Sequence, residues 1–351
     1  MMIRPRFLWA AALMLGAGAA TAADWKADQD AGWKAYKEGR IEEAEALLKS
    51  AEKAAREFGA ADPRLAVTLD HLAWVYCAEG RCDEAEPLAR EALAIREKAL
   101  PGDAAAMADS LNTLAAVYDE AGKPALAKPL YVRCLAAAEK ADGAESAGVA
   151  AALDNLAAVD HALGDAAEAE SLYKRALAVR EKVAGADSAD LSATLHNLGL
   201  LYIDQKKYAD AEPLLKRALA INEKARGADH PEVAAALETL GWLYAVQGKP
   251  AEAEPLLKKA LALYEADLGA EHAHVARAAG ELGRVCLERG HQDEAESCCK
   301  QAVAILEKSA GDPRELAEAL DDYAAVLRKA GREADAAKLE ARAAGLRKPA
   351  E

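Results

Sequence analysis

Aromatic residues are scarce in this sequence: phenylalanine, tyrosine and tryptophan make up 5% of its 351 residues, although 52% are hydrophobic. Alanine is the commonest residue instead, and an alanine-rich, charge-rich composition favours α-helices that pack closely on one another. Glycine and proline are too few for collagen-like or low-complexity sequence. The composition therefore indicates a helical protein with a sizeable core.

Basic residues are outnumbered: 44 lysines and arginines stand against 59 aspartates and glutamates, which gives a net charge of −15. A protein that binds nucleic acid regardless of sequence needs a basic surface, so we predict no nucleic-acid partner. Docking on an anionic lipid surface is disfavoured for the same reason. Solubility explains the acidity, because an elongated protein with much surface benefits from charge of one sign.

Long apolar runs are missing except at the N-terminus. Arg4 and Arg6 precede an uncharged run over residues 7–20, and Ala20-Thr21-Ala22 has the small-x-small form that a signal peptidase accepts. We therefore predict a signal peptide over residues 1–22 and secretion across the inner membrane, into the periplasm if the source is a Gram-negative bacterium. The run is short for a transmembrane helix, although an uncleaved anchor stays open as the alternative. After cleavage we expect no membrane insertion.

Motifs that carry chemistry are also missing. The sequence has no phosphate-binding loop, nucleophile elbow, dinucleotide fingerprint, CxxC pair or HExxH motif. Its carboxylates recur at regular positions that are typical of a solvated helix face, as in Glu84, Glu86, Glu168 and Glu170. We therefore predict a non-catalytic protein with no cofactor and no metal site.

What the sequence does have is an internal repeat of 41 or 42 residues, a period that indicates a solenoid. Its anchor is an alanine that occurs eight times, at Ala44, Ala85, Ala127, Ala169, Ala211, Ala253, Ala295 and Ala336. Five residues before the anchor stands a glycine in every repeat but the fifth, which has Lys206. Twelve residues before it stands a glycine or an alanine, and seven residues after it an alanine or, once, Cys134.

These columns predict pairs of helices. The stretch before the glycine carries Leu69, Leu72, Val75 and Tyr76 at helical spacing, and glycine suits the left-handed residue that ends a helix. A second helix follows at once, so the two must be antiparallel neighbours. One pair cannot bury its apolar faces alone, whereas a stack of pairs can. We predict an array over residues 23–347, followed by a short tail at residues 348–351.

The order small residue, tyrosine, glycine, alanine, large residue, alanine resembles the tetratricopeptide repeat. Residues 195–223, LHNLGLLYIDQKKYADAEPLLKRALAINE, are similar to the 42-residue variant of kinesin light chains and many bacterial scaffold proteins, as is the loop Asp229-His230-Pro231. The resemblance implies an all-α, right-handed superhelical solenoid of about eight antiparallel helix pairs. It also implies a role in protein binding, although the pattern specifies fold more closely than function.

The resemblance places a concave groove on the first helix of each pair. Asparagine fourteen residues before the anchor is typical of the kinesin-light-chain class and can clamp the backbone of an extended peptide. Tryptophan eleven residues before it either anchors an apolar side chain or packs on the neighbouring helix. Only two arginines could hold a C-terminal carboxylate, which disfavours a receptor for chaperone tails. We predict a groove centred on repeats two to six, with contacts at Trp74, His71, Thr113, Asn155, Asn197, Leu200, Thr239, Trp242, Arg277 and Arg284.

Six cysteines in an exported protein are candidates for disulfides. Cys286 and Cys299 fall in two columns that face each other between paired helices, and we predict a bridge between them. Cys298 is adjacent to Cys299 and could compete with it for Cys286. Cys77 and Cys82 flank a turn and could form a second bridge, whereas Cys134 has the position of a small core residue. The alternative for all six is a buried, small, hydrophobic side chain.

The function that these observations favour is a non-catalytic scaffold of the cell envelope that holds an extended peptide segment of a partner protein in the groove. The alternative is a structural or assembly factor that uses its convex face and edges and leaves the groove empty.

Overall fold

The computed structural model describes residues 22–309 and 312–347, and these residues form sixteen α-helices and no strand. The chain divides after residue 141 into two compact units. The predicted signal peptide at residues 1–22 lies outside the described residues except for Ala22, and the tail at 348–351 lies outside them entirely. No helix in the described ranges combines the length and apolar character that a membrane crossing requires.

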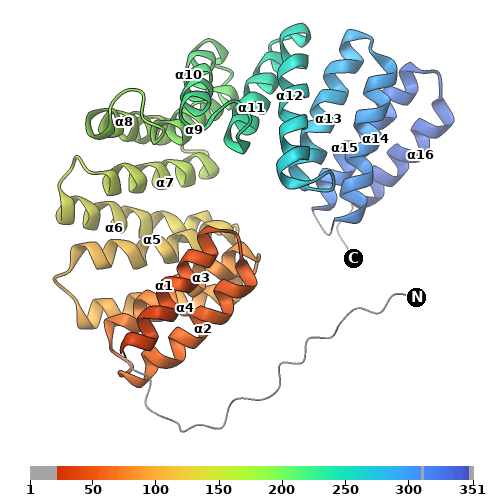
Figure 1. Cartoon of the computed structure of the whole chain (residues 1–351). Coiled ribbons are helices and arrows are strands. Elements are labelled where there is room, and N and C mark those ends of the chain that lie inside the picture. The colour runs from red at the N-terminus through yellow and green to blue at the C-terminus, as the bar shows by residue number, and fades with distance from the viewer. Residues whose placement is uncertain (1–21, 310–311, 348–351) are drawn as a thin grey trace, which may run out of the picture. The chain divides into compact units, whose positions relative to one another are not determined.

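The first unit holds three helix pairs (Figure 1). Its helices are α1 (Ala22–Lys37), α2 (Ile41–Glu57), α3 (Pro63–Ala78), α4 (Cys82–Ala99), α5 (Ala104–Glu120) and α6 (Pro124–Asp142). Within the pairs, α1 packs on α2 and α3 on α4, while α2 and α4 contact the first helix of the next pair. First helices also touch in series, α1 with α3 and α3 with α5, which is the packing expected of a solenoid.

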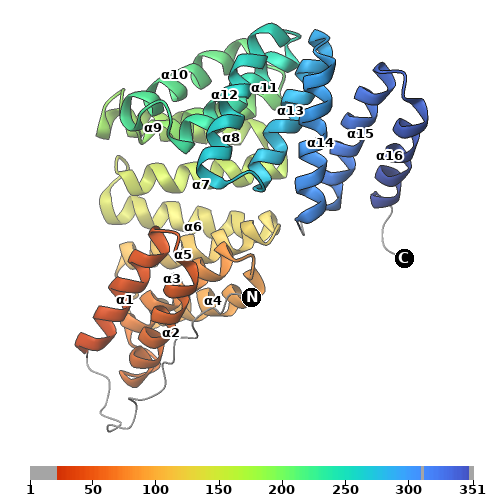
Figure 2. The same ribbon diagram turned by 45° about the vertical axis from the view of Figure 1, so that its right-hand side comes forward.

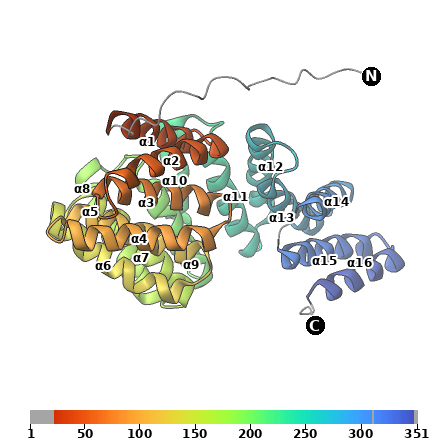
Figure 3. The same ribbon diagram turned by 90° about the horizontal axis from the view of Figure 1, so that it is seen from below.

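The second unit holds five pairs, and Figure 2 shows α13 to α16 standing next to one another. Its helices are α7 (Ala147–Leu163), α8 (Ala166–Ala184), α9 (Leu191–Asp204), α10 (Tyr208–Arg226), α11 (Pro231–Val246), α12 (Pro250–Leu268), α13 (Ala273–Arg289), α14 (Gln292–Lys308), α15 (Pro313–Lys329) and α16 (Glu333–Leu346). Figure 3 shows the last pair, α15 beside α16, from below. The first helices again touch in series from α7 through α9, α11 and α13 to α15. The predicted all-α array of helix pairs is therefore confirmed.

The predicted turns end most first helices as expected. The glycine column adopts a positive φ, for example +80° at Gly290 and +71° at Gly248. Lys206, which replaces glycine in the fifth repeat, has the same conformation at +59° and is the one non-glycine residue with a positive φ in the described ranges. The next helix begins within three residues, so each pair is antiparallel.

The small-residue column packs on the large-residue column of the same repeat. An added Cβ on Gly199 would lie 2.6 Å from Leu215 Cδ2, and one on Gly241 would lie 2.8 Å from Leu257 Cγ. These glycines therefore let a leucine of the second helix reach the backbone of the first. The eight anchor alanines are fully buried beside these contacts.

The cysteines do not form the predicted bridge. All six are free thiols, and Cys286 and Cys299 are buried in one hydrophobic cluster. The reason is the direction of the Cys299 side chain: its Sγ lies 2.5 Å from where a Cβ on Gly283 would be, so it fills the gap that leucines fill in repeats five and six. The Sγ atoms of Cys77 and Cys82 lie 3.5 Å apart across their turn, also without a bond.

Buried carboxylates recur in every second repeat, at positions 84 residues apart: Asp70, Asp154 and Glu238. Asp70 is 2.9 Å from Arg96 and accepts a hydrogen bond of 2.9 Å from Ser110. Asp154 is bound by Arg180 and Thr194, at 2.8 and 2.9 Å. In each case one partner comes from the second helix of the same repeat and the other from the first helix of the next. The carboxylates therefore tie successive repeats together.

Candidate functional site

Three cavities follow one another along the first helices of the second unit. The first, of about 370 Å³, lies between α13 and α15. The second, of about 260 Å³, is lined by α9, α11 and α13, and the third, of about 250 Å³, mainly by α11 and α13. Glu281 lines all three, and Trp242 lines the two that adjoin α11. The cavities therefore share lining residues across repeats five to eight, and we refer to this series of cavities as the channel.

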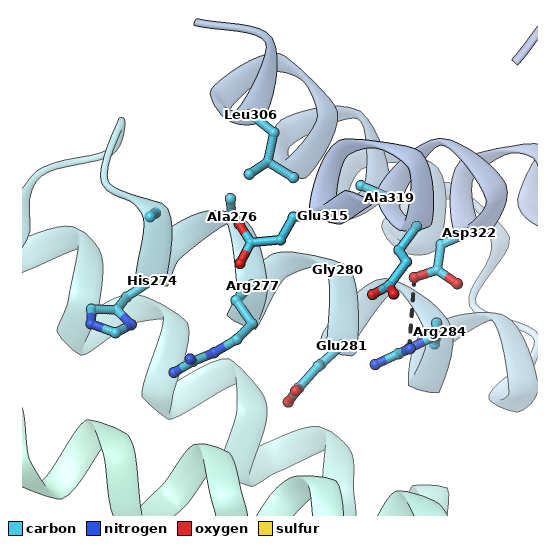
Figure 4. Close-up of a pocket in the computed structure, with 12 residues that line it drawn as sticks. His274, Ala276, Arg277, Gly280, Glu281, Arg284, Leu306, Glu315, Ala319 and Asp322 are labelled. Carbon is cyan, nitrogen blue, oxygen red and sulfur yellow. Dashed lines mark ion pairs between the residues drawn. The ribbon is translucent and has the colours of Figure 1, made fainter. Parts of the chain in front are cut away.

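The α13–α15 cavity is lined by charged side chains of both signs (Figure 4). Arg277, Glu281 and Arg284 extend from the same side of α13, because their spacing of four and three residues keeps them on one helix face. Asp322 faces them from α15, with its Oδ2 3.7 Å from Arg284 Nε. Glu315 and Glu318 complete the α15 wall, so carboxylates outnumber guanidinium groups around this space.

Glu238 on α11 fixes the position of the Arg277 guanidinium. Its carboxylate is buried and accepts hydrogen bonds from Arg277 Nε at 2.9 Å and Nη2 at 2.7 Å, as well as from the Tyr264 hydroxyl at 2.9 Å. A bidentate contact of this kind holds a guanidinium in one plane. The charge of Arg277 is therefore already balanced within the protein and is not free for a ligand carboxylate.

Glu281 has no comparable partner. Its Oε2 atom is buried and accepts no hydrogen bond from the described part of the chain. Burial raises the pKa of this carboxyl to about 8, and the Glu238 carboxylate adds to the rise while Arg284 and Arg277 oppose it. Burial likewise raises the pKa of Asp322 to about 6, against the opposing charge of Arg284. The cavity thus holds two acidic groups whose charged forms are destabilised by burial more than the neighbouring arginines stabilise them.

Five of the predicted groove residues line these cavities, namely Leu200, Thr239, Trp242, Arg277 and Arg284. Trp242 borders two cavities and also packs against the hydrophobic core. The Thr239 hydroxyl donates to the Ala235 carbonyl at 3.0 Å. Asn197 and Asn155 are half-buried on α9 and α7.

The other predicted contacts belong to the first unit. His71 is stacked on Trp33, with ring centroids 3.9 Å apart, and its Nδ1 is in contact with Gln29 Nε2. Burial lowers the pKa of His71 to about 4, so the ring is neutral at physiological pH. Thr113 is buried and donates to the Asp109 carbonyl at 3.1 Å, while Trp74 is half-buried. His71 and Thr113 thus make internal contacts.

The structure adds Glu238, Tyr264, Glu318 and Asp322 to the site. Glu238 could have been found from its spacing, because it continues the series of Asp70 and Asp154 at intervals of 84 residues. Tyr264 occupies the position of Arg96 and Arg180 in that series, so the loss of an arginine there signals that Glu238 needs a cation from elsewhere. The α15 residues could also have been found from their spacing, because Glu318 and Asp322 stand eighteen and fourteen residues before Ala336, as Arg277 and Glu281 do before Ala295.

Comparison with known proteins agrees with this architecture. The family profile described as tetratricopeptide repeat matches residues 35–98, 105–182, 190–266 and 243–308. The chain therefore belongs to the tetratricopeptide repeat family, whose arrays are in general non-catalytic scaffolds for protein interaction. The comparison with curated protein sequences gives no match.

Several solved structures are similar. BtubC (BKLC) from P. vanneervenii is 28% identical with a TM-score of 0.57, covering 65% of this chain and 92% of its own. A variant of a kinesin light chain from Podospora anserina, with nearly identical TPR-like repeats, is 26% identical with a TM-score of 0.51, covering 59% and 97%. The apo form of the quorum sensor NprR from B. thuringiensis shares the fold at 14% identity, with a TM-score of 0.68, covering 92% and 87%. The predicted likeness to kinesin light chains is thereby confirmed.

Proposed function

We propose that this protein is a scaffold of the cell envelope that binds an extended polypeptide segment of a partner along α9, α11, α13 and α15, with a lysine or arginine of that segment in the α13–α15 cavity. The buried, unpartnered Oε2 of Glu281 carries the proposal. A buried carboxylate without a hydrogen-bond donor is costly, and a cation that enters the cavity removes that cost.

The shape of the channel favours an extended segment over a small molecule. Its three cavities share Glu281 and run past successive first helices, so a ligand that fills all of them must be long. Trp242 and Leu200 offer apolar surface at the α9–α11 end, where a hydrophobic side chain of the segment can pack. Polar and apolar contacts at separate points along a groove are typical of peptide recognition.

The charges favour a basic side chain in the α13–α15 cavity. Arg277 is engaged by Glu238, and Arg284 lies beside Asp322, which leaves Glu281, Glu315 and Glu318 of this wall without an ion pair among the described residues. An ammonium or guanidinium group placed among them can donate to Glu281. Charge-assisted hydrogen bonds of this kind are worth about 1.5–3 kcal/mol each.

The test compares two fluorescent peptides that differ at one residue. Selection from a library of short synthetic peptides on the purified protein supplies the sequence, and we expect enrichment of lysine and arginine at one position. The selected peptide and its norleucine counterpart, which keeps the alkyl chain and lacks the charge, are then titrated by fluorescence anisotropy. We expect the norleucine peptide to bind roughly tenfold to 100-fold more weakly.

Two variants connect this preference to the cavity. Glu281→Gln with Asp322→Asn should remove most of the difference between the two peptides while the protein stays folded. Glu252→Gln, on the exposed face of α12, removes one carboxylate elsewhere in the same unit and should change nothing. Equal binding of both peptides to wild-type protein would refute the basic-residue site. A photo-crosslinking residue is also placed at position 242 in one variant and at position 252 in another. Labelling of the peptide from position 252 but not from position 242 would refute the groove and favour the outer face.

The envelope location rests on the basic and apolar segment at residues 4–22. Expression of the full sequence in a Gram-negative host should deliver the protein to the periplasmic fraction with Ala23 as its first residue, which intact-mass measurement detects. Recovery in the cytoplasm with residues 1–22 retained would contradict export.

A further inference from the structure

An acidic residue next to the anchor alanine recurs at the junctions between repeats, with a tyrosine and a basic residue at matching positions of the next repeat. Glu212, for example, is 2.7 Å from Lys216 on its own helix and accepts a hydrogen bond of 3.1 Å from Tyr244 in the next repeat. A basic residue in the next turn completes each group, and its side chain lies over the tyrosine ring or beside the glutamate. The glutamate, tyrosine and basic residue of these four junctions are Glu45, Tyr76 and Arg81; Glu86, Tyr118 and Lys123; Glu170, Tyr202 and Lys207; and Glu212, Tyr244 and Lys249.

The junction of α12, α13 and α14 departs from this arrangement at two positions at once. Glu254 keeps its place and is 2.7 Å from Lys258, but Cys286 stands where the tyrosine would be and His291 where the basic residue would be. Both replacements introduce side chains that bind transition metals, and both face the same glutamate. His291 Nδ1 lies 3.2 Å from Glu254 Oε2.

The four side chains at this junction bring metal-binding atoms close together. The Sγ of Cys286, a ring nitrogen of His291 and one carboxylate oxygen each of Glu254 and Glu294 all lie within 4.8 Å of one another. Tetrahedral zinc with ligands at about 2.0–2.3 Å needs its donor atoms about 3.5 Å apart, so small side-chain rotations suffice. We propose that Glu254, Cys286, His291 and Glu294 form a binding site for a transition-metal ion, of which Zn²⁺ fits the donor set best.

The chemistry of the donors selects the metal. Thiolate and imidazole ligands suit Zn²⁺, whereas Ca²⁺ and Mg²⁺ prefer a shell of oxygen atoms. Cys286 and Glu254 are buried, while the His291 and Glu294 side chains are 43% and 38% exposed, so an ion can enter from solvent at the turn between α13 and α14. Binding converts the Cys286 thiol to a thiolate and releases its proton to solvent.

Two cations of the protein compete for the same carboxylates. Lys258 Nζ is 2.7 Å from an oxygen of Glu254 and 2.7 Å from an oxygen of Glu294, and Arg289 is 2.7 Å from the other oxygen of Glu254. Each contact involves a side chain that is at least one third exposed, so both cations can move away into solvent. The site therefore exchanges three ion pairs for four coordinate bonds, and the two cations that are released return to solvent.

The chelator-treated full-length protein, titrated with Co²⁺, provides the test. Cobalt replaces zinc in such sites and reports its ligands by colour: we expect one ion per chain, visible d–d bands of tetrahedral cobalt and a near-ultraviolet band from sulfur-to-cobalt charge transfer. Addition of Zn²⁺ should abolish these bands. Their absence on titration, with the protein folded by circular dichroism, would overturn the proposal.

The variant Cys286→Tyr with His291→Lys is the sharpest control, because it restores the residues of the other four junctions and should fold. It should lose the sulfur band and weaken cobalt binding by 100-fold or more, estimated from the roughly tenfold to 100-fold losses that follow milder changes around metal ligands. Cys134→Ala removes a buried thiol of the first unit and should leave the spectrum unchanged. Lys258→Met removes a competing cation, so cobalt should bind more tightly, whereas a purely structural ion-pair cluster would show no such gain. A sulfur band that persists in the double variant would assign the metal to other thiols.

Discussion

Arg277 on α13 donates two hydrogen bonds to Glu238 on α11, so the seventh repeat is attached to the sixth by a charge that also borders the channel. The Glu238 side chain is 6% exposed and the Arg277 side chain is 56% exposed, so the carboxylate is the more deeply buried partner of this ion pair. Removal of the arginine leaves that carboxylate with the Tyr264 hydroxyl alone.

We therefore expect Arg277→Ala to lower the free energy of unfolding by about 2 kcal/mol, less than the 3–5 kcal/mol typical of a fully buried pair because the arginine is half exposed. Urea unfolding monitored by circular dichroism measures the change. Arg284→Ala breaks a looser, exposed contact and should cost less than about 0.5 kcal/mol. The double variant Glu238→Gln, Arg277→Ala tests the coupling. If its loss of unfolding free energy equals the sum of the losses in the two single variants, the two residues are not coupled.

Gly199→Ala should destabilise the protein although alanine favours a helix. The new Cβ would lie 2.6 Å from Leu215 Cδ2 and 2.8 Å from its Cγ, so the leucine must move inside a packed interface. Overpacking of this kind costs about 1–3 kcal/mol, which exceeds the gain of about 1 kcal/mol in helix propensity. Thermal unfolding tests the sign.

Gly280→Ala is the matched control for Gly199→Ala. The nearest atom to its Cβ is Ala302 Cβ at 3.9 Å, so the propensity gain is unopposed and the protein should become more stable. Stabilisation by both substitutions would contradict the packing argument.

Lys206→Gly should raise stability by about 1 kcal/mol, because a residue with a side chain pays that much to adopt the left-handed conformation found at φ +59°. Gly248→Ala tests the converse at the same turn of the following repeat and should lower stability by a similar amount. Both are measured by the midpoint of urea unfolding. If neither substitution changes the urea midpoint, the conformation of these turns does not contribute to the free energy of unfolding.

How far the sequence alone predicts this molecule can be judged from such positions. Gly290 and the anchor alanines were predictable because backbone geometry and close packing each permit few residue types there. Glu281 stands fourteen residues before its anchor, in the same column as Asn155 and Asn197, but its lack of a partner could not be predicted, because that depends on which way Arg277 and Arg284 turn. The same limit applies to Cys299: its column was read correctly as one that faces the first helix, yet its Sγ points to Gly283 and not to Cys286.

Stability should depend on pH through Glu281, whose pKa burial raises from 4.5 to about 8. Between these values the folded protein binds more protons than the unfolded chain, so its free energy of unfolding falls as pH rises through this window. We expect the loss to be roughly 1–3 kcal/mol larger in wild type than in Glu281→Gln. The titratable and charged groups that line the cavities around this carboxyl are His196 on α9, Glu238 on α11, Arg277, Arg284 and Glu288 on α13, and Glu315, Glu318 and Asp322 on α15.

Urea unfolding of both proteins across this pH range provides the measurement. An identical pH dependence in wild type and Glu281→Gln would show that the Glu281 carboxyl is ionised and solvated, and would remove the reason for a basic ligand group. Asp322→Asn, whose wild-type pKa is raised to about 6, should change only the lower part of the same window.

The carboxylates Asp70, Asp154 and Glu238 give the array a longer period than its helices do. Because they recur every 84 residues and each joins its own repeat to the next, the smallest interchangeable module is two repeats long. Excision of repeat three alone would set Asp70 against Ala152, which has no donor, whereas excision of repeats three and four would set it against Thr194, whose hydroxyl can replace that of Ser110. We therefore expect this scaffold to tolerate lengthening or shortening, by engineering or by gene duplication, in steps of two repeats.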